Sequence, residues 1–382
     1  MQPSDRVRQL IAAALSGLAR RVFGMPFWIL YVLVLGFCLF QNGFSLSPQT
    51  SGLFLVSADI TRNPFIYRRA DEWLLSSFLG PLLASVTSMN RSIEYFALMH
   101  LAIFFVFFTV LVVLIRRRNG DFAARCVLLI FMLSPLSNVL LTWIGSPDIL
   151  TALLSMTIVV FWNNPIVLGL CAFLLGTNHP EQGGIILLLL TMLSALTRKA
   201  RTTLRFAVVG LGSLALGIAA VQWYFDRHNF EIVFTRLDYL QVYGLFQYVR
   251  ATLSNPFALV FSLYNVLVLF VAAYVAYFWK RERIALGFLI YSALAFIVIL
   301  FTLDQTRVFA ILTFPALLLL ALSRPFSSLE GAERHFFEVV LVIALTVGIL
   351  LPRFVVWNGS VYVSAYPSIF HALQATPVPR AG

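Results

Sequence analysis

Long runs of apolar residues, separated by short polar or basic segments, extend from residue 26 to residue 351. A run of about 20 apolar residues is long enough to cross a bilayer as a helix. The pattern therefore predicts an all-α polytopic membrane protein with about eleven transmembrane helices. Their expected ranges are 26–40, 95–115, 126–144, 149–162, 165–176, 184–197, 206–224, 258–278, 284–302, 310–322 and 337–351.

Two of these segments, 149–162 and 165–176, are shorter than an ordinary span, and Asn163, Asn164 and Pro165 separate them. They fit either a hairpin that dips into the membrane and returns, or two short spans through a thin, protein-lined region. In both arrangements the chain comes back to the side on which residue 149 begins.

The polar stretches include two long loops, residues 41–94 and 225–257. Within the first, residues 73–86 are apolar but short, with Gly80 and Pro81 in the middle, which predicts an interfacial helix lying along the membrane surface. The second loop alternates aromatic and charged residues, a composition typical of the membrane interface. The sequence predicts one transmembrane domain over residues 1–382, without a soluble domain.

Composition strengthens the membrane assignment, because the chain is 60% hydrophobic and 11% charged. Soluble domains average about 45–50% apolar and about 25% charged residues. The net charge of +11 lies in short basic runs between apolar segments, which argues against a nucleic-acid partner. Cys38, Cys126 and Cys171 each fall inside an apolar run, as small buried hydrophobes do, and their spacing fits no disulfide framework or zinc site.

The loops sort by charge into two sets. One set receives 17 of the 27 basic residues and six of the 16 acidic residues, and the other receives ten of each. By the positive-inside rule the basic set is cytoplasmic, and so is the N-terminus. No cleavage site follows the first apolar run, so we expect residues 26–40 to be a retained anchor.

The outer face receives ionisable residues from four separate segments. Charged groups at membrane depth are costly, and by default they mark function. A carboxylate there can act as a general base towards a sugar hydroxyl, and arginines can hold a phosphate or diphosphate. The candidates are Asp59, Arg62, Arg68, Arg69, Asp71 and Glu72 in the first loop, then Asp148, then His179 and Glu181, then Asp304 and Arg307.

Each candidate also has a purely structural interpretation. Asp148 fits the N-cap of the helix that follows it, and Asp71 and Glu72 fit the cap of the interfacial helix. Arg68 and Arg69 are placed where basic side chains snorkel to the interface.

The two later pairs have the same ambiguity. Asp304 and Arg307 are three residues apart, which fits an ion pair on one helical turn as well as a contact to a donor phosphate. His179 and Glu181 fit a local hydrogen bond as well as the lining of an active site.

Four segments together resemble the bacterial branch of the GT-C superfamily, polytopic glycosyltransferases that use polyprenyl-phosphate-linked sugars. They occur in the expected order and on the same predicted face. The segments are NPFIYRRADEWLLSSFLGPLLA (63–84), GSPDILTALL (145–154), NHPEQGGIILL (178–188) and LDQTRVFAILTFPALLLL (303–320).

The resemblance implies an inverting enzyme of the bacterial inner membrane. Its periplasmic face would move a sugar from a polyprenyl-phosphate donor to an extracytoplasmic glycan or lipid. In this family an acidic residue of the first outer loop is the catalytic base, which corresponds best to Asp59. Asp148 and Glu181 are further catalytic candidates. A divalent cation, Mg²⁺ or Mn²⁺, is compatible with Asp71 and Glu72 as ligands, but no certain cofactor or ligand set is implied.

Two alternatives stay open. A glycan polymerase would use a diphosphate-linked oligosaccharide and need more arginines on the outer face. A non-enzymatic transporter or flippase of lipid-linked sugars would have ionisable residues at mid-membrane depth and internal two-fold pseudo-symmetry. His100 is the one ionisable residue in the middle of a predicted span, and no repeat is visible, which argues against transport.

Overall fold

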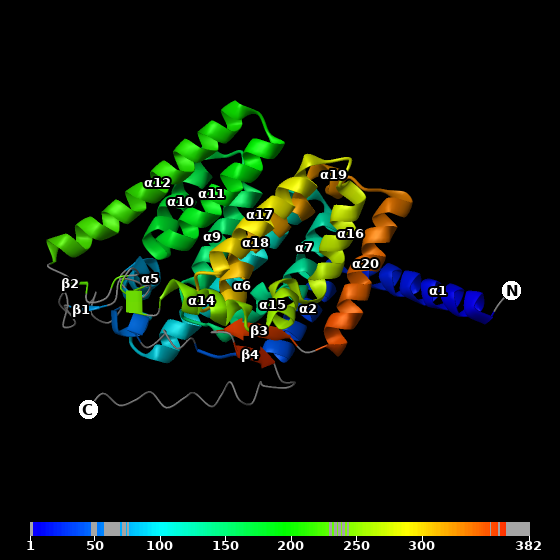
Figure 1. Ribbon diagram of the computed structural model, residues 1–382, viewed down its shortest axis with the longest axis horizontal. Helices are drawn as coiled ribbons and strands as arrows, with labels where there is room; N and C mark the ends of the chain where they lie inside the picture. The colour runs from blue at the N-terminus through cyan, green and yellow to red at the C-terminus, as the bar shows by residue number, and fades with distance from the viewer. Residues whose placement is uncertain are drawn as a thin grey trace.

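The computed structural model of the protein is a bundle of α-helices (Figure 1). It describes residues 3–46, 52–56, 69–70, 74, 76–228, 231–232, 235, 238, 241–242, 244–351, 353–357 and 360–363. The helices are α1 Pro3–Gly24, α2 Phe27–Asn42, α5 Leu79–Val86, α6 Ile93–Asn119, α7 Asp121–Leu133, α8 Pro135–Thr142, α9 Asp148–Val160, α10 Pro165–Asn178, α11 Pro180–Thr197, α12 Ala200–Arg227, α14 Leu245–Leu253, α15 Pro256–Tyr264, η1 Asn265–Leu267, α16 Val268–Phe278, α17 Arg283–Ile299, α18 Gln305–Leu322, α19 Arg324–Ser327 and α20 Gly331–Leu350. The strands are β1 Arg69–Ala70, β2 Glu231–Ile232, β3 Phe354–Trp357 and β4 Ser360–Val363.

Length and hydropathy make five helical segments of the described chain candidates for membrane spans: α6, α11, α12, Pro256–Phe278 and α18. Two bent pairs raise this number to seven, namely α1 with α2, bent by 105°, and α7 with α8, bent by 64°. Helices α9, α10 and α17 are apolar but shorter. The chain is therefore an all-α, multi-pass membrane protein. The structure supports five to seven spans by these criteria, fewer than the eleven predicted from the sequence.

The two short segments form an antiparallel pair, α9 and α10. Asn164 caps the start of α10, because its Oδ1 accepts hydrogen bonds from the backbone N–H groups of Ile166 and Val167. At the turn, Arg198 donates to Asn163 Oδ1 at 2.6 Å and Arg205 donates to the Asn163 carbonyl oxygen at 3.0 Å. The turn therefore lies beside basic residues that the charge pattern assigns to the cytoplasmic side.

Helices α10 and α12 approach closely because glycines face each other. A Cβ at Gly176 would lie 2.3 Å from the carbonyl oxygen of Leu214, and a Cβ at Gly217 would lie 2.2 Å from that of Phe173. Small residues at such positions let two helix backbones pack directly against each other, which is a common device in membranes.

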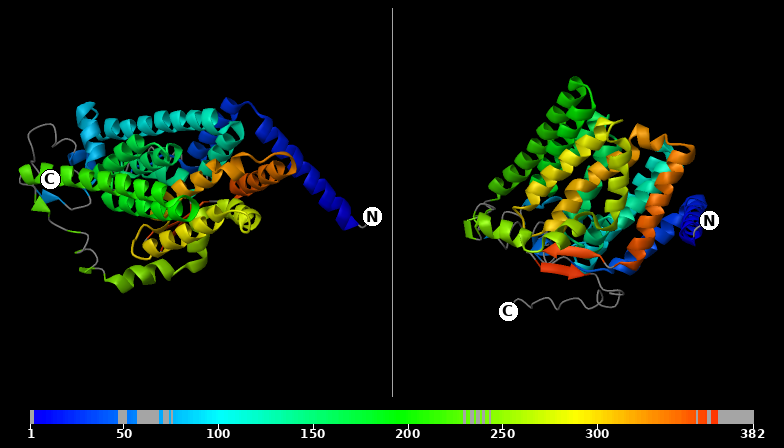
Figure 2. Two further views of the ribbon diagram at one scale, coloured as in Figure 1. Left: turned by 90° about the horizontal axis from the view of Figure 1, so that it is seen from above. Right: turned by 45° about the vertical axis from the view of Figure 1, so that its right-hand side comes forward.

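Helix α18 runs through the centre of the bundle, where α7, α8, α9, α11, α15 and α17 contact it (Figure 1). Almost all of its residues are buried. Helix α1, in contrast, projects away from the bundle (Figure 2). Its C-terminal half still packs against the bundle through Ala19 and Phe23.

The two long outer loops meet at one end of the bundle. Strand β1 of the first loop pairs in parallel with β2 of the second, in the register Arg69 to Glu231. Helix α5 covers the second half of the segment in which an interfacial helix is predicted. Phe78, just before α5, packs its ring 5.0 Å from that of Tyr224 near the end of α12. The antiparallel hairpin of β3 and β4 lies at the same end of the bundle (Figure 1).

Candidate functional site

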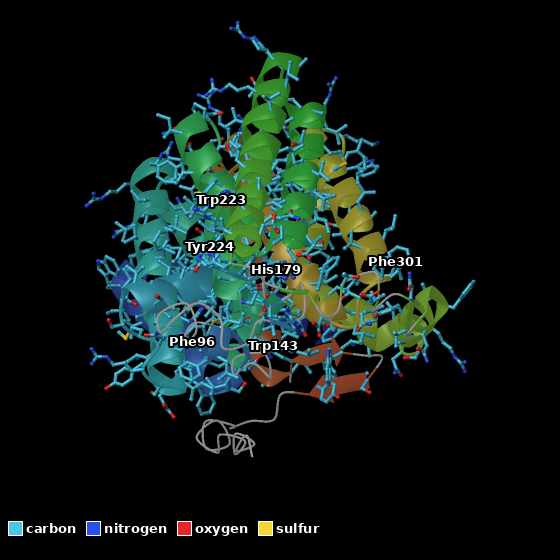
Figure 3. The ribbon with its side chains drawn as sticks, turned by 90° about the vertical axis from the view of Figure 1, so that its left-hand side faces the viewer. Phe96, Trp143, His179, Trp223, Tyr224 and Phe301 are labelled. Atoms are coloured by element: carbon cyan, nitrogen blue, oxygen red, sulfur yellow. The ribbon has the colours of Figure 1, made fainter. Side chains whose placement is uncertain are left out.

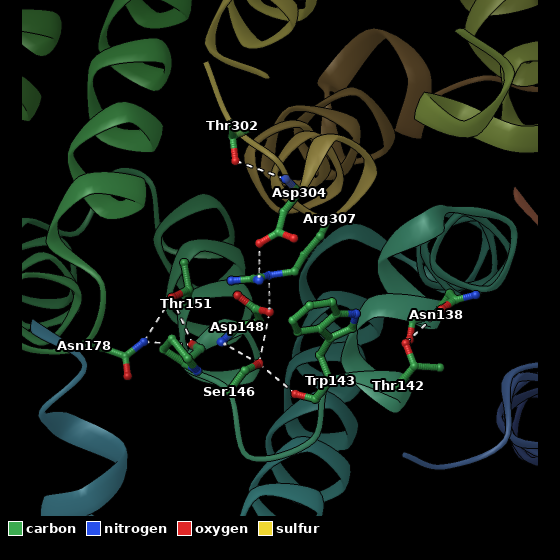
Figure 4. A network of polar contacts seen from close by, with 11 residues as sticks. Asn138, Thr142, Trp143, Ser146, Asp148, Thr151, Asn178, Thr302, Asp304 and Arg307 are labelled. Carbon is green, nitrogen blue, oxygen red and sulfur yellow. Dashed lines mark hydrogen bonds and ion pairs between the residues drawn. The ribbon is translucent and has the colours of Figure 1, made fainter. Parts of the chain in front are cut away.

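One arginine, Arg307 in the first turn of α18, binds two carboxylates (Figure 4). Its Nε lies 2.8 Å from Oδ2 of Asp148, the first residue of α9. Its Nη1 donates to Oδ2 of Asp304, which precedes α18, at 2.6 Å. Asp148 is 0% exposed and Arg307 is 5% exposed. We call these three residues the Asp–Arg–Asp cluster.

The loop before α9 holds Asp148 in place. Ser146 Oγ lies 3.0 Å from Asp148 Oδ2 and 2.7 Å from the carbonyl oxygen of Trp143. The indole ring of Trp143 faces the Arg307 guanidinium, whose central carbon is 4.5 Å from the ring centroid. Gly145, with a φ of 84°, allows the tight turn that brings Trp143 and Ser146 to the cluster.

The start of α18 is anchored by two polar residues that precede Arg307. Gln305 Nε2 donates to Thr252 Oγ1 of α14 at 3.0 Å. The hydroxyl of Thr306 lies 2.8 Å from that of Ser262 in α15, and it accepts the backbone N–H of Val356 in β3 at 2.9 Å. The position of Arg307 is thus fixed from several elements.

The second short outer loop reaches the same place. Asn178, the last residue of α10, donates from Nδ2 to the Pro147 carbonyl oxygen and to Thr151 Oγ1, each at 2.9 Å. The next residue, His179, lies with Nδ1 3.1 Å from Oε2 of Glu181. Three segments with ionisable outer-face residues, around Asp148, His179 and Asp304, therefore converge.

Several buried oxygen atoms of this region accept no hydrogen bond from the described residues. They are Oδ1 of Asp148, Oδ1 of Asp304, Oδ1 of Asn178, Oε1 of Gln182 and Oε1 of Gln305. Because two carboxylates share one guanidinium, the Asp–Arg–Asp cluster carries a net negative charge when both acids are ionised. Burying a carboxylate oxygen without a hydrogen-bond donor is costly. These oxygens therefore mark a region where further hydrogen bonds can form.

Aromatic side chains flank this region. In Figure 3, Trp143 and His179 lie between Phe96 on one side and Phe301 on the other, with Trp223 and Tyr224 above them. Trp223 is 67% exposed and Phe301 is 44% exposed. Exposed aromatic side chains near polar loops are typical of the membrane–water boundary.

The remaining predicted residues belong to the first outer loop. Asp59, Arg62, Arg68, Asp71 and Glu72 lie outside the described residues. Arg69 belongs to β1, but only its backbone is described.

The path of the first outer loop begins next to the cluster. Ser45 donates its backbone N–H to the Leu141 carbonyl oxygen at 3.1 Å, and Leu46 forms a β-bridge with Ile144. The described start of the first outer loop, Ser45 and Leu46, thus lies beside the turn that carries Trp143 and Ser146.

Sequence reasoning missed three residues of this site. Ser146 and Asn178 are neutral, whereas the candidates predicted from the sequence are all ionisable. Both nevertheless stand in the polar segments that were singled out, Ser146 in GSPD and Asn178 in NHPEQ. Trp143 precedes the first of these segments, and nothing in the sequence distinguishes it from other interfacial tryptophans.

A second buried polar cluster surrounds Arg353, which is 5% exposed. Its Nε donates to Gln41 Oε1 at 2.8 Å, and its Nη atoms bind the carbonyl oxygens of Met132 and Ser134 and the Ser137 hydroxyl. These carbonyls end α7 at its 64° bend with α8. Arg353 therefore caps the C-terminal end of a helix, where a positive charge is favourable.

Among the described residues, no group of three or more His, Cys, Asp and Glu side chains is arranged to hold a metal ion. Compared with protein-family models, with curated proteins and with solved structures, the chain has no significant match. The function must therefore be argued from the geometry of the site.

Proposed function

We propose that this protein is a glycosyltransferase of a bacterial inner membrane. It moves a sugar from a polyprenyl-phosphate-linked donor to an extracytoplasmic glycan or lipid acceptor. The observation that carries the proposal is the convergence of three outer-face loops on the Asp–Arg–Asp cluster, beside the start of the first outer loop. Buried and incompletely satisfied charges of this kind are expensive, and in membrane proteins they are usually kept for function.

In the proposed reaction, Asp59 accepts the proton of the acceptor hydroxyl. The acceptor oxygen forms a bond to the anomeric carbon while the bond from that carbon to the phosphate oxygen breaks. A single in-line displacement inverts the anomeric configuration. The leaving group is polyprenyl phosphate, and Arg62, Arg68 and Arg69 stabilise its charge.

The lipid part of the donor needs an apolar surface that reaches the membrane. The exposed aromatic residues Trp223, near the end of α12, and Phe301, three residues before Asp304, support this role. A long apolar chain that lies on such side chains keeps its tail in the bilayer while the phosphate and sugar reach the loops.

The proposal includes eleven crossings, with α9 and α10 as two short ones. Arg198 and Arg205 at their turn, and Asn178 beside Pro147 at the other end, support this topology. A helix of 13 residues, such as α9, is about 20 Å long, which is shorter than the hydrocarbon core of a bilayer. The bilayer would therefore have to be locally thin around α9, or other helices would have to shield α9 from lipid.

The test is turnover by the purified full-length protein in lipid nanodiscs, with a panel of polyprenyl-phosphate-linked sugars and glycan acceptors. Asp59→Asn is compared with Asp238→Asn, which alters an acid of the other long loop. Removal of a general base should lower kcat by ~10²–10⁴-fold, whereas Asp238→Asn should change it less than about twofold. If no lipid-linked sugar binds or reacts, the glycosyltransferase proposal is wrong.

A further inference from the structure

We propose that the Asp–Arg–Asp cluster binds the hydroxyl groups of the sugar and not the lipid phosphate. The identity of the donor as a lipid-linked sugar rests on the proposed function, whereas the preference for hydroxyl groups follows from the cluster itself. This inference assigns Arg307 a different role from the phosphate contact expected from the sequence.

The charges of the cluster oppose a phosphate. Arg307 already contacts Asp148 at 2.8 Å and Asp304 at 2.6 Å. A phosphate that approached the guanidinium would come close to both carboxylates. Like charges a few ångströms apart repel strongly, and burial strengthens the repulsion. A phosphate site needs unpaired positive charge, and this guanidinium is more than neutralised.

The open hydrogen-bonding positions favour hydroxyl groups. Oδ1 of Asp148 and Oδ1 of Asp304 are buried acceptors without a donor among the described residues. No described residue binds Nη2 of Arg307, so that nitrogen still has hydrogens to donate. A hydroxyl group donates one hydrogen bond and accepts others, so adjacent hydroxyls of a sugar match this alternation of acceptors and donor.

A phosphate group matches the donor of this site but not its acceptors. An ionised phosphate diester has no hydrogen to give to a carboxylate oxygen, so Oδ1 of both acids would stay unpaired. Asn178 adds a further acceptor, because its Nδ2 donates to Pro147 and Thr151 while its Oδ1 has no donor within the described part of the chain. The region thus presents more acceptors than donors, as a polyol requires.

The cluster is also rigid enough to select a ligand geometry. Ser146 and Trp143 hold Asp148 and the guanidinium on one side, and Gln305 and Thr306 fix the start of α18. Groups held in place before binding lose little freedom when the ligand arrives. We therefore expect discrimination between sugars that differ in the orientation of one hydroxyl.

The decisive variant is Asp304→Ser. Serine is a favourable residue at the N-cap position of α18, and the substitution removes the carboxylate and one negative charge. The matched control is Asp121→Ser, which removes an acid that Arg116 and Arg125 bind at the opposite end of the bundle. Binding is measured by isothermal titration calorimetry on the full-length protein in nanodiscs. The ligands are free monosaccharides, polyprenyl phosphate without sugar, and the same lipid carrying each sugar.

The inference predicts that Asp304→Ser weakens binding of the free sugar and of the lipid-linked sugar by about tenfold or more, the loss expected for a charge-assisted hydrogen bond. Binding of the sugar-free lipid phosphate should change less than about twofold, and Asp121→Ser should change none of the three. If the cluster holds the phosphate instead, Asp304→Ser should strengthen binding of the sugar-free lipid, and the inference is overturned.

The remaining outcomes separate this inference from the proposed function. Sugar binding that depends on Asp304, with no binding of any lipid phosphate, upholds the sugar site and overturns the glycosyltransferase. Lipid-linked sugars that bind equally well to the wild type and to Asp304→Ser leave the glycosyltransferase standing and overturn the sugar site. No binding of sugar in any form overturns both.

Discussion

Arg307 in α18 and Asp148 in α9 come within 2.8 Å of each other, although each belongs to a different outer-face segment of the sequence. Both side chains are buried, and a second acid, Asp304, completes the pair on the other side. The contact joins two helices that are buried along nearly their whole length, α18 and α9. The stability of this region should therefore depend on the balance of charge within the cluster.

We expect Arg307→Met to destabilise the protein by about 3–5 kcal/mol, because Asp148 would be left buried without a countercharge. Adding Asp148→Asn should recover part of this loss, since the uncompensated charge disappears. Denaturant unfolding in mixed micelles measures both. The control is Arg281→Met, which breaks the exposed Arg281–Glu333 pair and should cost less than about 1 kcal/mol. Equal effects of the two single substitutions would contradict a buried ion pair.

Substitution of Gly217 by Ala should disrupt the packing of α10 on α12, because the added methyl group would overlap the backbone carbonyl of Phe173. The backbone cannot move aside as a flexible side chain can, so we expect a loss of at least about 2 kcal/mol. Gly212→Ala in the same helix meets no atom within 4 Å, and it should stabilise by about 0.5–1 kcal/mol. The order of the two melting temperatures tests the close contact.

Arg353→Lys should destabilise the protein by about 2–4 kcal/mol, even though the charge is kept. A lysine has one donating atom and cannot reach Gln41, Ser137 and the carbonyl oxygens that end α7 at the same time. Arg324→Lys, at an exposed position, provides the comparison and should be close to neutral. Similar unfolding curves for the two variants would rule out the proposed capping role.

A single cysteine at Asn163 should react with a membrane-impermeant maleimide only from the cytoplasmic side. One at Asn90 or Ser254 should react only from the outer side. The expectation follows from eleven crossings, because the turn between α9 and α10 lies beside Arg198 and Arg205. Cys38, Cys126 and Cys171 are buried, so their background labelling should be low. Labelling of Asn163 from the outer side would contradict two crossings by α9 and α10.

The positions of most apolar helices could be predicted because each is a run of apolar residues that the sequence displays directly. The single helix expected over 126–144 is instead two helices, α7 and α8, because Pro135 interrupts it, and α14 lies within the segment predicted as the second long loop. Even the break between α9 and α10 has a visible cause in Asn164 and Pro165, a cap and a first helical residue. The meeting of Asp148 with Arg307 could not be predicted, because topology assigns residues to a face but gives no distance across it. Helix packing determines that distance.

The hairpin of β3 and β4 was missed for another reason. Trp357 pairs with Ser360, so two residues connect the strands, and the sequence there is Asn358 and Gly359. An Asn-Gly pair between two segments of β-forming residues is a strong signal of a two-residue hairpin turn. The burial of Arg353 could not be predicted either, because it depends on how α2 and α7 pack around that residue.

The burial of α18 has a consequence for how the protein responds to its membrane. A helix in contact with lipid must tilt or shift when the bilayer becomes thicker or thinner. Helix α18 is surrounded by other helices along nearly its whole length, so its side chains contact protein and not lipid. The depth of Arg307 is therefore set by its neighbours in the bundle, and the outer helices can adapt to lipids of different chain length while the site keeps its geometry.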